Sequence, residues 1–353
     1  MTDSPPRVLQ VCPNDHPPFA DVVAFHARAL ERLGFDVGTV FFAPPTSKLV
    51  PDATYLQQAD LRATRALGAT LRRALDGGQG EPFALALCHR YRGMRGFMAS
   101  GVPARRTLCV AHEFGLFRRA RRRLRQRLLP SGADFAGVSG AVVEELAATV
   151  AVPTLLPNGI DLEREDDLRL DRDAARAQLG LAGEHLHVGV VGRLHPKKQP
   201  QLALEGFRAF AAGQPNAQLT FLGEGELAAV LQQSAEGLPV RFGGFVAHAS
   251  RYLRAFDVVL ITSTEAEAFN MAALEAMAAG VPVVAGPAPG PRFVLGDAGV
   301  FFGRPDPAAV ADALVRACVP GAAERLGQRG LERAQREFSV AAGARRLSAY
   351  VDR

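Results

Sequence analysis

Short, continuous apolar runs alternate with helix-forming segments through most of this 353-residue chain. In the first half the runs are RVLQVC (7–12), DVGTVFF (36–42), FALALC (83–88), TLCVAH (107–112), FAGVS (135–139) and PTLLP (153–157). Strands that are apolar on both sides are typical of parallel sheets that helices cover on both faces. The pattern therefore predicts an α/β fold built on doubly wound parallel sheets.

The alternation stops in the charged stretch DLEREDDLRLDRD (161–173) and then begins again. The later apolar runs are 185–192, 217–223, 239–244, 257–263 and 281–286. Because the chain is longer than one hydrophobic core usually allows, two domains are expected, 1–163 and 164–338. The last segment, 339–353, is a helix that could pack back on the first domain. Ligands of such sheets bind beyond the carboxyl ends of the strands, so a site in a cleft between the domains is expected.

Positive charge is concentrated in one segment, FGLFRRARRRLRQRLLP (114–130). It carries seven arginines, more than the whole net charge of +5: Arg118, Arg119, Arg121, Arg122, Arg123, Arg125 and Arg127. No stacking aromatic residues are interleaved, which argues against a nucleic-acid partner. Leucines at helical spacing indicate a basic amphipathic helix, suited to an anionic membrane surface or a phosphorylated glycolipid. A helix whose arginines are simply solvated remains the alternative.

The four cysteines are far apart and form no CxxC pair, so neither a disulfide framework nor a zinc site is predicted. No apolar run approaches the roughly 20 residues that span a bilayer, and the first residues lack a signal sequence. We expect a cytoplasmic protein, peripheral on the inner face of the cytoplasmic membrane.

The segment TEAEAFNMAALEAMAAGVPVV (264–284) carries the most chemical information. An acidic turn follows a strand, and an alanine-rich helix is predicted over 269–279. Glu267 precedes this helix and Glu275 lies eight residues later, where carboxylates could accept hydrogen bonds from sugar hydroxyls. The backbone N–H groups at the helix start would form an anion site; they belong to Phe269, Asn270 and Met271. Alternatively, Glu267 only interacts with the helix dipole and Glu275 is solvated.

The E-x7-E spacing followed by AMAAGVPVV resembles the signature of retaining glycosyltransferases of family 4, which have the GT-B fold. Further similar segments occur in the family's order: TLCVAHEF (107–114), LPNGID (156–161), VVGRLHPKKQ (190–199), LTFLGEGELAAV (219–230), RFGGFV (241–246) and AFDVVLITS (255–263). The resemblance covers most of the chain. It implies two Rossmann-like domains facing a cleft, the first binding an acceptor and the second a nucleotide-diphosphate sugar of the UDP or GDP type.

The resemblance also implies roles for cationic and acidic residues. Arg193 and Lys198 would hold the donor diphosphate, because fixed cations stabilise the charge that develops on this leaving group. Glu275 would bind the ribose, and Glu267 the transferred sugar. His112 would face the reacting centre. Solvated loop charges at 193 and 198, and a purely structural histidine, are the alternatives.

The mechanism that the resemblance implies is transfer with retention of configuration, without a metal, a cofactor or a dedicated protein base. The loop of Gly244, Phe245 and Val246 would lie near the nucleotide base. The family usually has a Gly-Gly pair after the first strand, but this chain has CPNDHPPFADVV (12–23). Because proline has no N–H, Phe19 and Ala20 would have to supply any backbone donors there.

Two further departures are Asn270, where glycine is common, and Arg292, where an acidic residue is frequent. Two competing motifs are weak. GEGELA (223–228) has the spacing of a dinucleotide fingerprint, but its glutamates would repel a pyrophosphate. DRD (171–173) is better explained as a helix cap than as a metal site.

The overall sequence resembles those of bacterial hexosyltransferases of lipopolysaccharide core or surface polysaccharide. The predicted function is therefore transfer of a sugar to a cell-envelope glycan, a glycolipid or a lipid-linked glycan. A nucleotide-sugar epimerase or hydrolase of the same fold is one alternative. A catalytically silent GT-B protein that binds anionic surfaces is the other, because the glycine pair is missing.

Overall fold

The computed structural model describes residues 5–47, 49–75, 81–128, 132–181, 183 and 185–351. The chain forms two compact units, which we call unit 1 (Met1–Gly159 with Phe338–Arg353) and unit 2 (Ile160–Glu337). The sequence pattern predicts these two unit boundaries slightly later in the chain, between residues 163 and 164 and between residues 338 and 339. Residues 352–353 of the expected terminal helix lie outside the described residues.

Unit 1 contains a seven-stranded sheet in which every pairing is parallel. Its strands are β1 (Arg7–Cys12), β2 (Asp36–Phe41), β3 (Thr54–Tyr55), β4 (Phe83–His89), β5 (Ala104–Ala111), β6 (Asp134–Gly137) and β7 (Thr154–Leu155). The order is β3-β2-β1-β4-β5-β6-β7, so the winding direction reverses between β1 and β4. The carboxyl ends of these two strands are where such a sheet binds ligands.

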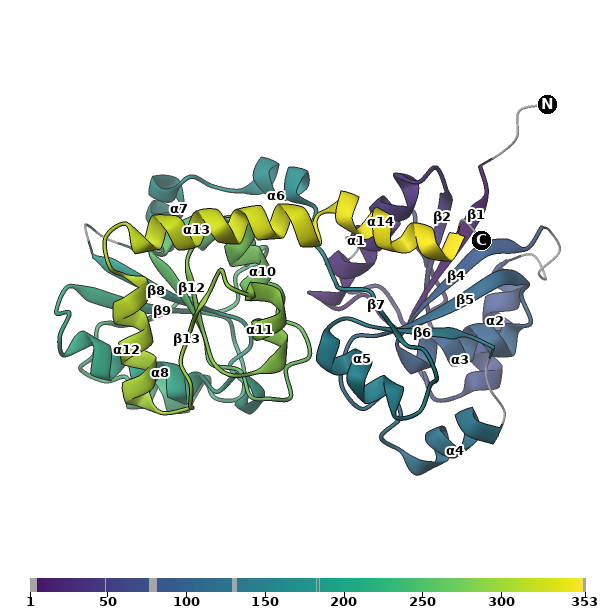
Figure 1. The fold of residues 1–353 in the computed structure, drawn as a ribbon, viewed down its shortest axis with the longest axis horizontal. Helices are drawn as coiled ribbons and strands as arrows, with labels where there is room; N and C mark the ends of the chain where they lie inside the picture. The colour runs from purple at the N-terminus through teal and green to yellow at the C-terminus, as the bar shows by residue number, and fades with distance from the viewer. Residues whose placement is uncertain are drawn as a thin grey trace. The chain divides into compact units, whose positions relative to one another are not determined.

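Helices cover both faces of this sheet (Figure 1). They are α1 (Phe19–Glu31), α2 (Thr64–Ala74), α3 (Arg90–Ser100), α4 (Ala120–Leu128), α5 (Gly140–Ala147) and the C-terminal α14 (Val340–Val351). α2 packs on α3, and α14 packs on α1. A Cβ at Gly343 would lie 2.6 Å from the ring of Phe25, so the close approach of α14 to α1 requires glycine.

Unit 2 contains a six-stranded parallel sheet in the order β10-β9-β8-β11-β12-β13. Its strands are β8 (Leu186–Val191), β9 (Ala217–Leu222), β10 (Val240–Phe242), β11 (Val258–Ile261), β12 (Val283–Ala285) and β13 (Val300–Phe301). The winding reverses between β8 and β11. The short strands β3 and β13 were not expected.

The helices of unit 2 also lie on both faces of its sheet (Figure 1). They are α6 (Leu162–Leu168), α7 (Arg172–Leu179), α8 (Pro200–Ala211), α9 (Ala228–Ser234), α10 (Met271–Ala278), α11 (Pro289–Leu295), α12 (Pro307–Ala317) and α13 (Ala322–Arg333), with 3-10 turns η2 (Pro196–Lys198) and η3 (Ala249–Ala255) and the π-helical turn η4 (Ala334–Phe338) at its end. α8 packs on α12, whereas α7 packs on η3. The Asp171 carboxylate accepts the Ala174 N–H at 2.8 Å, which confirms that DRD is a helix cap.

The core of each unit lies between its sheet and its helices. In unit 2, Phe207 of α8, Phe221 of β9 and Val310 of α12 are completely buried in one cluster. In unit 1, Cys12 and Cys109 are buried free thiols, and burial raises the pKa of Cys109 to about 12. Among the described helices, none combines the length and apolar character needed to cross a bilayer.

Candidate active site

An ion pair lies at the reversal point of the unit 2 sheet. The Lys198 ammonium donates to the Glu267 carboxylate at 2.6 Å. The Glu267 side chain is only 10% exposed and that of Lys198 31%, so the pair is sheltered while its cation still reaches solvent. Lys198 and Glu267 are 69 positions apart in the sequence. The structure thus brings together two residues that were predicted to share one site.

Hydrogen bonds to the backbone carbonyls of residues 197–199 hold η2 against the end of β11. The Thr262 hydroxyl donates to the carbonyls of Lys198 and Gln199 at 2.8 and 2.9 Å, and the Thr264 N–H donates to the Lys197 carbonyl at 2.9 Å. Gln199 has a φ of 46°, a left-handed conformation that lets the chain turn from η2 directly into α8. Lys198 is therefore positioned by the fold and not only by its ion pair.

Helix α10 begins two residues later than the sequence predicts. Asn270 is the N-cap, and its side chain accepts the Ala273 N–H at 2.8 Å, which explains an asparagine at this position. Phe269 and Asn270 therefore precede the helix and are buried. The N–H groups of Asn270 and Met271 have no acceptor among the residues that the structure describes. These donors lie three and four residues after Glu267.

The start of α11 packs directly on the segment that carries Glu267. The Gly290 N–H donates to the Glu267 carbonyl at 2.9 Å. A Cβ at Gly290 would lie 2.6 Å from that carbonyl oxygen and 2.7 Å from the Phe269 nitrogen. Arg292, the departure noted above, stacks over the Phe301 ring at 4.9 Å. Its exposed side chain therefore packs against β13 of unit 2.

The two other charged residues predicted for this site lie on neighbouring elements. Arg193 follows the end of β8, the strand next to β11, and its exposed side chain has no hydrogen-bond or ionic partner in the described part of the chain. Glu275 lies on α10, on the half-buried side that it shares with Met271 and Ala272. The Arg193 side chain makes no hydrogen bond or ion pair with Glu267 among the described residues.

The predicted base loop follows β10 and is tied to the loop after β9. The Gly223 N–H donates to the Gly244 carbonyl at 2.7 Å, and the Phe245 N–H donates to the Glu224 carboxylate at 3.3 Å. A Cβ at Gly223 would lie 2.0 Å from the Gly192 carbonyl oxygen. The glycines and glutamate of GEGELA therefore serve loop packing. The Phe245 side chain is 69% exposed.

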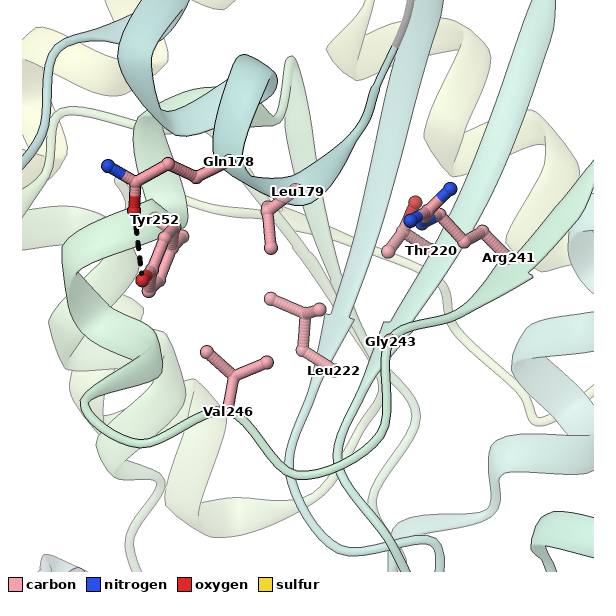
Figure 2. A pocket seen from close by; sticks show the side chains of 8 residues that line it. All are labelled: Gln178, Leu179, Thr220, Leu222, Arg241, Gly243, Val246 and Tyr252. Carbon is pink, nitrogen blue, oxygen red and sulfur yellow. Dashed lines mark hydrogen bonds between the residues drawn. The ribbon is translucent and has the colours of Figure 1, made fainter.

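A pocket opens behind this loop (Figure 2). Its lining comes from α7, β9, β10, the base loop and η3, as Gln178, Leu179, Thr220, Leu222, Arg241, Gly243, Val246 and Tyr252. Figure 2 shows the side chains of Leu179, Leu222 and Val246 converging, while the Tyr252 hydroxyl donates to Gln178 at 3.2 Å. Val246 thus has an apolar neighbourhood in which a flat ring could pack.

In unit 1, His112 lies directly after β5 and is 9% exposed. Its Nδ1 is 3.1 Å from the Asn158 side-chain oxygen, and its Nε2 is 2.9 Å from Nδ1 of His89. Nε2 of His89 lies 3.0 Å from the side-chain oxygen of Gln10. Both ring nitrogens of His112 are therefore engaged within unit 1. Sequence reasoning missed Gln10, His89 and Asn158, although a glutamine inside the apolar strand VLQVC was a signal.

Burial lowers the pKa of both His89 and His112 well below the usual value, and the nearby Arg90 guanidinium acts in the same direction. Arg90 has a φ of 63°, and its guanidinium lies 4.5 Å from the centroid of the Phe19 ring. The Phe19 ring in turn meets the two histidine rings edge-on, at 5.6 and 5.2 Å. This cluster lies at the carboxyl ends of β4 and β5.

The loop after β1 differs from the sequence expectation. The Phe19 N–H donates to the His16 carbonyl at 2.9 Å, so it is already used within the loop, and Ala20 is completely buried. The Asp15 carboxylate accepts hydrogen bonds from the Thr46 and Ser47 N–H groups, both at 2.9 Å. A buried carboxylate thus fixes the loop in place of a glycine pair.

The arginine-rich segment forms α4, whose side chains are all at least partly exposed. Leu124 and Leu128 are 59% and 69% exposed. Arg122 stacks on Tyr91 of α3 at 4.3 Å and donates to the Leu116 carbonyl at 2.9 Å. No acidic side chain pairs with the arginines of α4 in the part of the chain that the structure describes.

The described residues contain no cluster of three or more histidine, cysteine or acidic side chains that could hold a metal ion. Residues 185–318 match the family model described as glycosyl transferases group 1. This segment is a group 1 glycosyl transferase domain. The domain contains Arg193, Lys198, Glu267, Glu275 and the base loop.

Curated relatives match the chain in part. The D-inositol 3-phosphate glycosyltransferase of Geodermatophilus obscurus is 34% identical over 205 residues, 53% of this chain and 44% of that protein. The GDP-mannose-dependent alpha-(1-6)-phosphatidylinositol dimannoside mannosyltransferase of Mycobacterium tuberculosis is 31% identical over 193 residues, 50% of each. The chain thus matches about half the length of these relatives.

The crystal structure of Anabaena HepE with UDP and glucose resembles the whole chain, with a TM-score of 0.80 at 18% identity, covering 98% of this chain and 99% of that one. At this identity the likeness concerns the fold alone. Together with the two parallel sheets, it shows that the group 1 domain and unit 1 have the GT-B fold.

Proposed function

We propose that the chain is a retaining glycosyltransferase that transfers a sugar from a nucleotide-diphosphate donor to an anionic, lipid-linked acceptor. The observation that carries the proposal is the sheltered Lys198–Glu267 pair at the reversal point of the group 1 domain. A partly exposed cation beside a sheltered acid, with unpaired N–H groups three and four residues after that acid, suits a pyrophosphate ester with sugar hydroxyls close by.

In this proposal Lys198 and Arg193 bind the donor diphosphate, with the N–H groups of Asn270 and Met271. Glu275 binds the ribose, Glu267 the transferred sugar, and the base packs beside the loop of 244–246. The acceptor oxygen attacks the anomeric carbon on the face that the diphosphate leaves. As the bond to the diphosphate breaks, its departing oxygen takes the acceptor proton, so the reaction requires neither a metal nor a protein base.

The acceptor class is proposed from α4 and from the relatives. The names of the two relatives above include inositol 3-phosphate and phosphatidylinositol. Unpaired arginines form strong bidentate hydrogen bonds with phosphate. We therefore favour a phosphorylated glycolipid or lipid-linked glycan of the cell envelope, bound by unit 1 on the inner face of the cytoplasmic membrane. Lipopolysaccharide core, the acceptor that the sequence resemblance implied, is one member of this class.

The test is transfer by the purified full chain from UDP- and GDP-linked sugars to phosphoinositide acceptors. Lys198→Ala and Glu275→Ala should each lose activity by about a hundredfold or more, while circular dichroism shows intact folding. Lys197→Ala is the matched control on the same turn and should retain activity. Full activity in both site variants would mean that the site is elsewhere.

The second candidate is binding of anionic surfaces without catalysis, which the use of the Phe19 N–H inside its own loop favours. An epimerase or hydrolase is distinguished in the same assay, because it consumes the donor without acceptor. Vesicle binding with no donor turnover by any nucleotide sugar would favour the silent protein.

A further inference from the structure

Four buried polar side chains form a continuous hydrogen-bonded row in unit 1. Gln10 of β1 meets His89 at 3.0 Å, His89 meets His112 at 2.9 Å, and His112 meets Asn158 at 3.1 Å. None is more than 9% exposed. The row crosses the reversal point of the sheet and ends one residue before the last residue of this part of unit 1.

The Gln10 end of the row fixes where the hydrogens lie. The Gln10 amide nitrogen is 3.2 Å from the Val23 carbonyl, which can only accept, so its side-chain oxygen must face His89. That oxygen can only accept as well, and Nε2 of His89 therefore carries a hydrogen. A neutral His89 then offers the lone pair of Nδ1, and Nε2 of His112 donates to it.

The Asn158 end has two electrostatic states. If His112 is neutral, its Nδ1 is an acceptor, and Asn158 must turn its NH2 group toward the ring. If Asn158 keeps its oxygen toward Nδ1, His112 carries hydrogens on both nitrogens and is a cation. The amide orientation of Asn158 and the charge of His112 are therefore linked.

The surroundings of the row favour the neutral state. The charged group that faces the histidines is the cation Arg90 of α3, and its partner Glu113, after β5, is 3.4 Å away from it and exposed. His26 of α1 is the other titratable neighbour, with its ring 5.4 Å from that of His89, and burial lowers its pKa to about 4. A second positive charge beside Arg90 in a buried site is unfavourable.

We propose, for the transfer reaction inferred above, that His89 and Asn158 are positioning residues that hold His112 neutral, with its only ring hydrogen on Nε2. Within the row, Nε2 of His112 donates this hydrogen to Nδ1 of His89. The outer nitrogen, Nδ1, is an acceptor, and Asn158 covers it with an amide donor. A substrate hydroxyl that takes the place of this amide would donate to His112, which a charged ring would not allow.

The first test is the hydrogen position itself, by two-bond ¹H–¹⁵N correlation spectra of the full chain with ¹⁵N-labelled histidine at pH 7. The His112 signals are assigned with His112→Gln. We expect one protonated and one unprotonated nitrogen in each ring, with hydrogen on Nε2 of both His89 and His112. Hydrogen on Nδ1 of His112, alone or on both nitrogens, would overturn the proposal. This measurement needs no substrate and no variant of the row.

The second test is Asn158→Asp, which replaces a group that can donate by a carboxylate that can only accept. The ring of His112 should then take up its second hydrogen at a higher pH than in the wild-type chain, because an opposite charge at this distance raises a histidine pKa by about one to three units. On acidification the spectrum of a doubly protonated ring should appear about one to three pH units earlier than in the wild-type chain. Transfer should fall over the same pH range and recover toward higher pH.

Asn216→Asp is the matched control, the same change on an exposed turn before β9, and should leave the spectrum and the pH profile unchanged. A merely structural Asn158 would lose activity equally at all pH values, and that result would contradict the positioning role. If the wild-type chain transfers no sugar, the proposed function fails, whereas the spectra still decide the state of the row.

Discussion

At the scale of single residues, the site of the group 1 domain depends on a charge pair that is partly removed from water. Breaking such a pair leaves one charge without compensation, which is more harmful than removing both. Stability and function can therefore be separated at Lys198 and Glu267. Removing the charge of Lys198 should lower both stability and activity. Removing the charge of Glu267 as well should restore stability but not activity.

Lys198→Met should lower the free energy of unfolding by about 1–3 kcal/mol, less than for a fully buried pair because the ammonium reaches solvent. The double variant Lys198→Met/Glu267→Gln should recover most of this loss but no transfer activity. Urea unfolding and donor turnover measure the two effects. Arg304→Met breaks the exposed pair with Asp306 and should cost less than about 0.5 kcal/mol. A double variant as unstable as the single one would contradict this account.

Residues could be predicted from the sequence where several of them act in one motif. Lys198 and Glu267 lie in two segments that resemble family motifs and occur in the family's order. In the structure the Lys198 ammonium and the Glu267 carboxylate are 2.6 Å apart. Gln10, His89 and Asn158 could not be assigned in this way. A single polar residue next to an apolar strand is equally consistent with a solvated end or a buried contact, and only the strand order β1-β4-β5 puts these residues in a row.

At the scale of elements, all strands except β3 and β13 were predictable, and the exact helix starts were not. The prediction of a helix from residue 269 failed because Asn270 is a cap and not a helical residue. Helix α6 lies in the charged stretch 161–173, where no element was expected, and Asp161 supplies its cap. Asp171 caps α7 at the end of this stretch. Local hydrogen bonds of side chains to the backbone decide such boundaries, and apolar periodicity does not report them.

The packing of α11 on the Glu267 segment gives a prediction at this scale. Gly290→Ala would insert a methyl group 2.6 Å from the Glu267 carbonyl oxygen, so α11 or the segment must shift. We expect a loss of about 1–3 kcal/mol in the free energy of unfolding, together with weaker donor binding. Gly213→Ala is the control, because its new methyl group would lie 3.9 Å from the nearest atom. Equal effects of the two changes on donor affinity, measured by calorimetry, would contradict the packing argument.

Helix α4 gives a second prediction at the element scale. Four arginines in α4 and the two residues before it have exposed side chains that make no hydrogen bond to another described residue. They can be replaced by glutamine without loss of a side-chain hydrogen bond: Arg118, Arg119, Arg121 and Arg125. At about 1 kcal/mol for each arginine near an anionic surface, the fourfold variant should lose most of its binding to phosphatidylserine vesicles.

Vesicle co-sedimentation at low and high salt measures this loss, since screening weakens the wild-type binding in the same way. The matched control makes the same four charge changes at exposed positions elsewhere, namely Arg65, Arg105, Arg325 and Arg329. If both variants lose binding equally, net charge and not α4 is responsible.

At the scale of the whole molecule, the two sheets follow from the alternation of apolar runs, and the return of α14 to α1 confirms that one unit is built from both ends of the chain. Unit 1 also concentrates buried imidazoles, with His26, His89 and His112 all within its core. These groups are held uncharged by the fold and become charged in the unfolded chain. Acid should therefore destabilise unit 1 most, since unit 2 contributes one such histidine, His187, whose pKa burial also lowers to about 4.

The sign follows from proton linkage. The pKa of His26 is lowered to about 4, and those of His89 and His112 lie well below the ordinary 6.5, so below pH 6.5 the unfolded chain binds more protons than the folded one. Stability is full above pH 6.5 and falls as the pH decreases toward the folded pKa values, by up to about 1.4 kcal/mol per pH unit for each histidine. His26→Phe, which removes one of these groups without touching the hydrogen-bonded row, should reduce the slope between pH 6 and 5 by one such contribution. Urea midpoints by circular dichroism across pH 7.5 to 5 measure the slope, and an unchanged slope in this variant would mean that His26 already carries a proton in the folded protein.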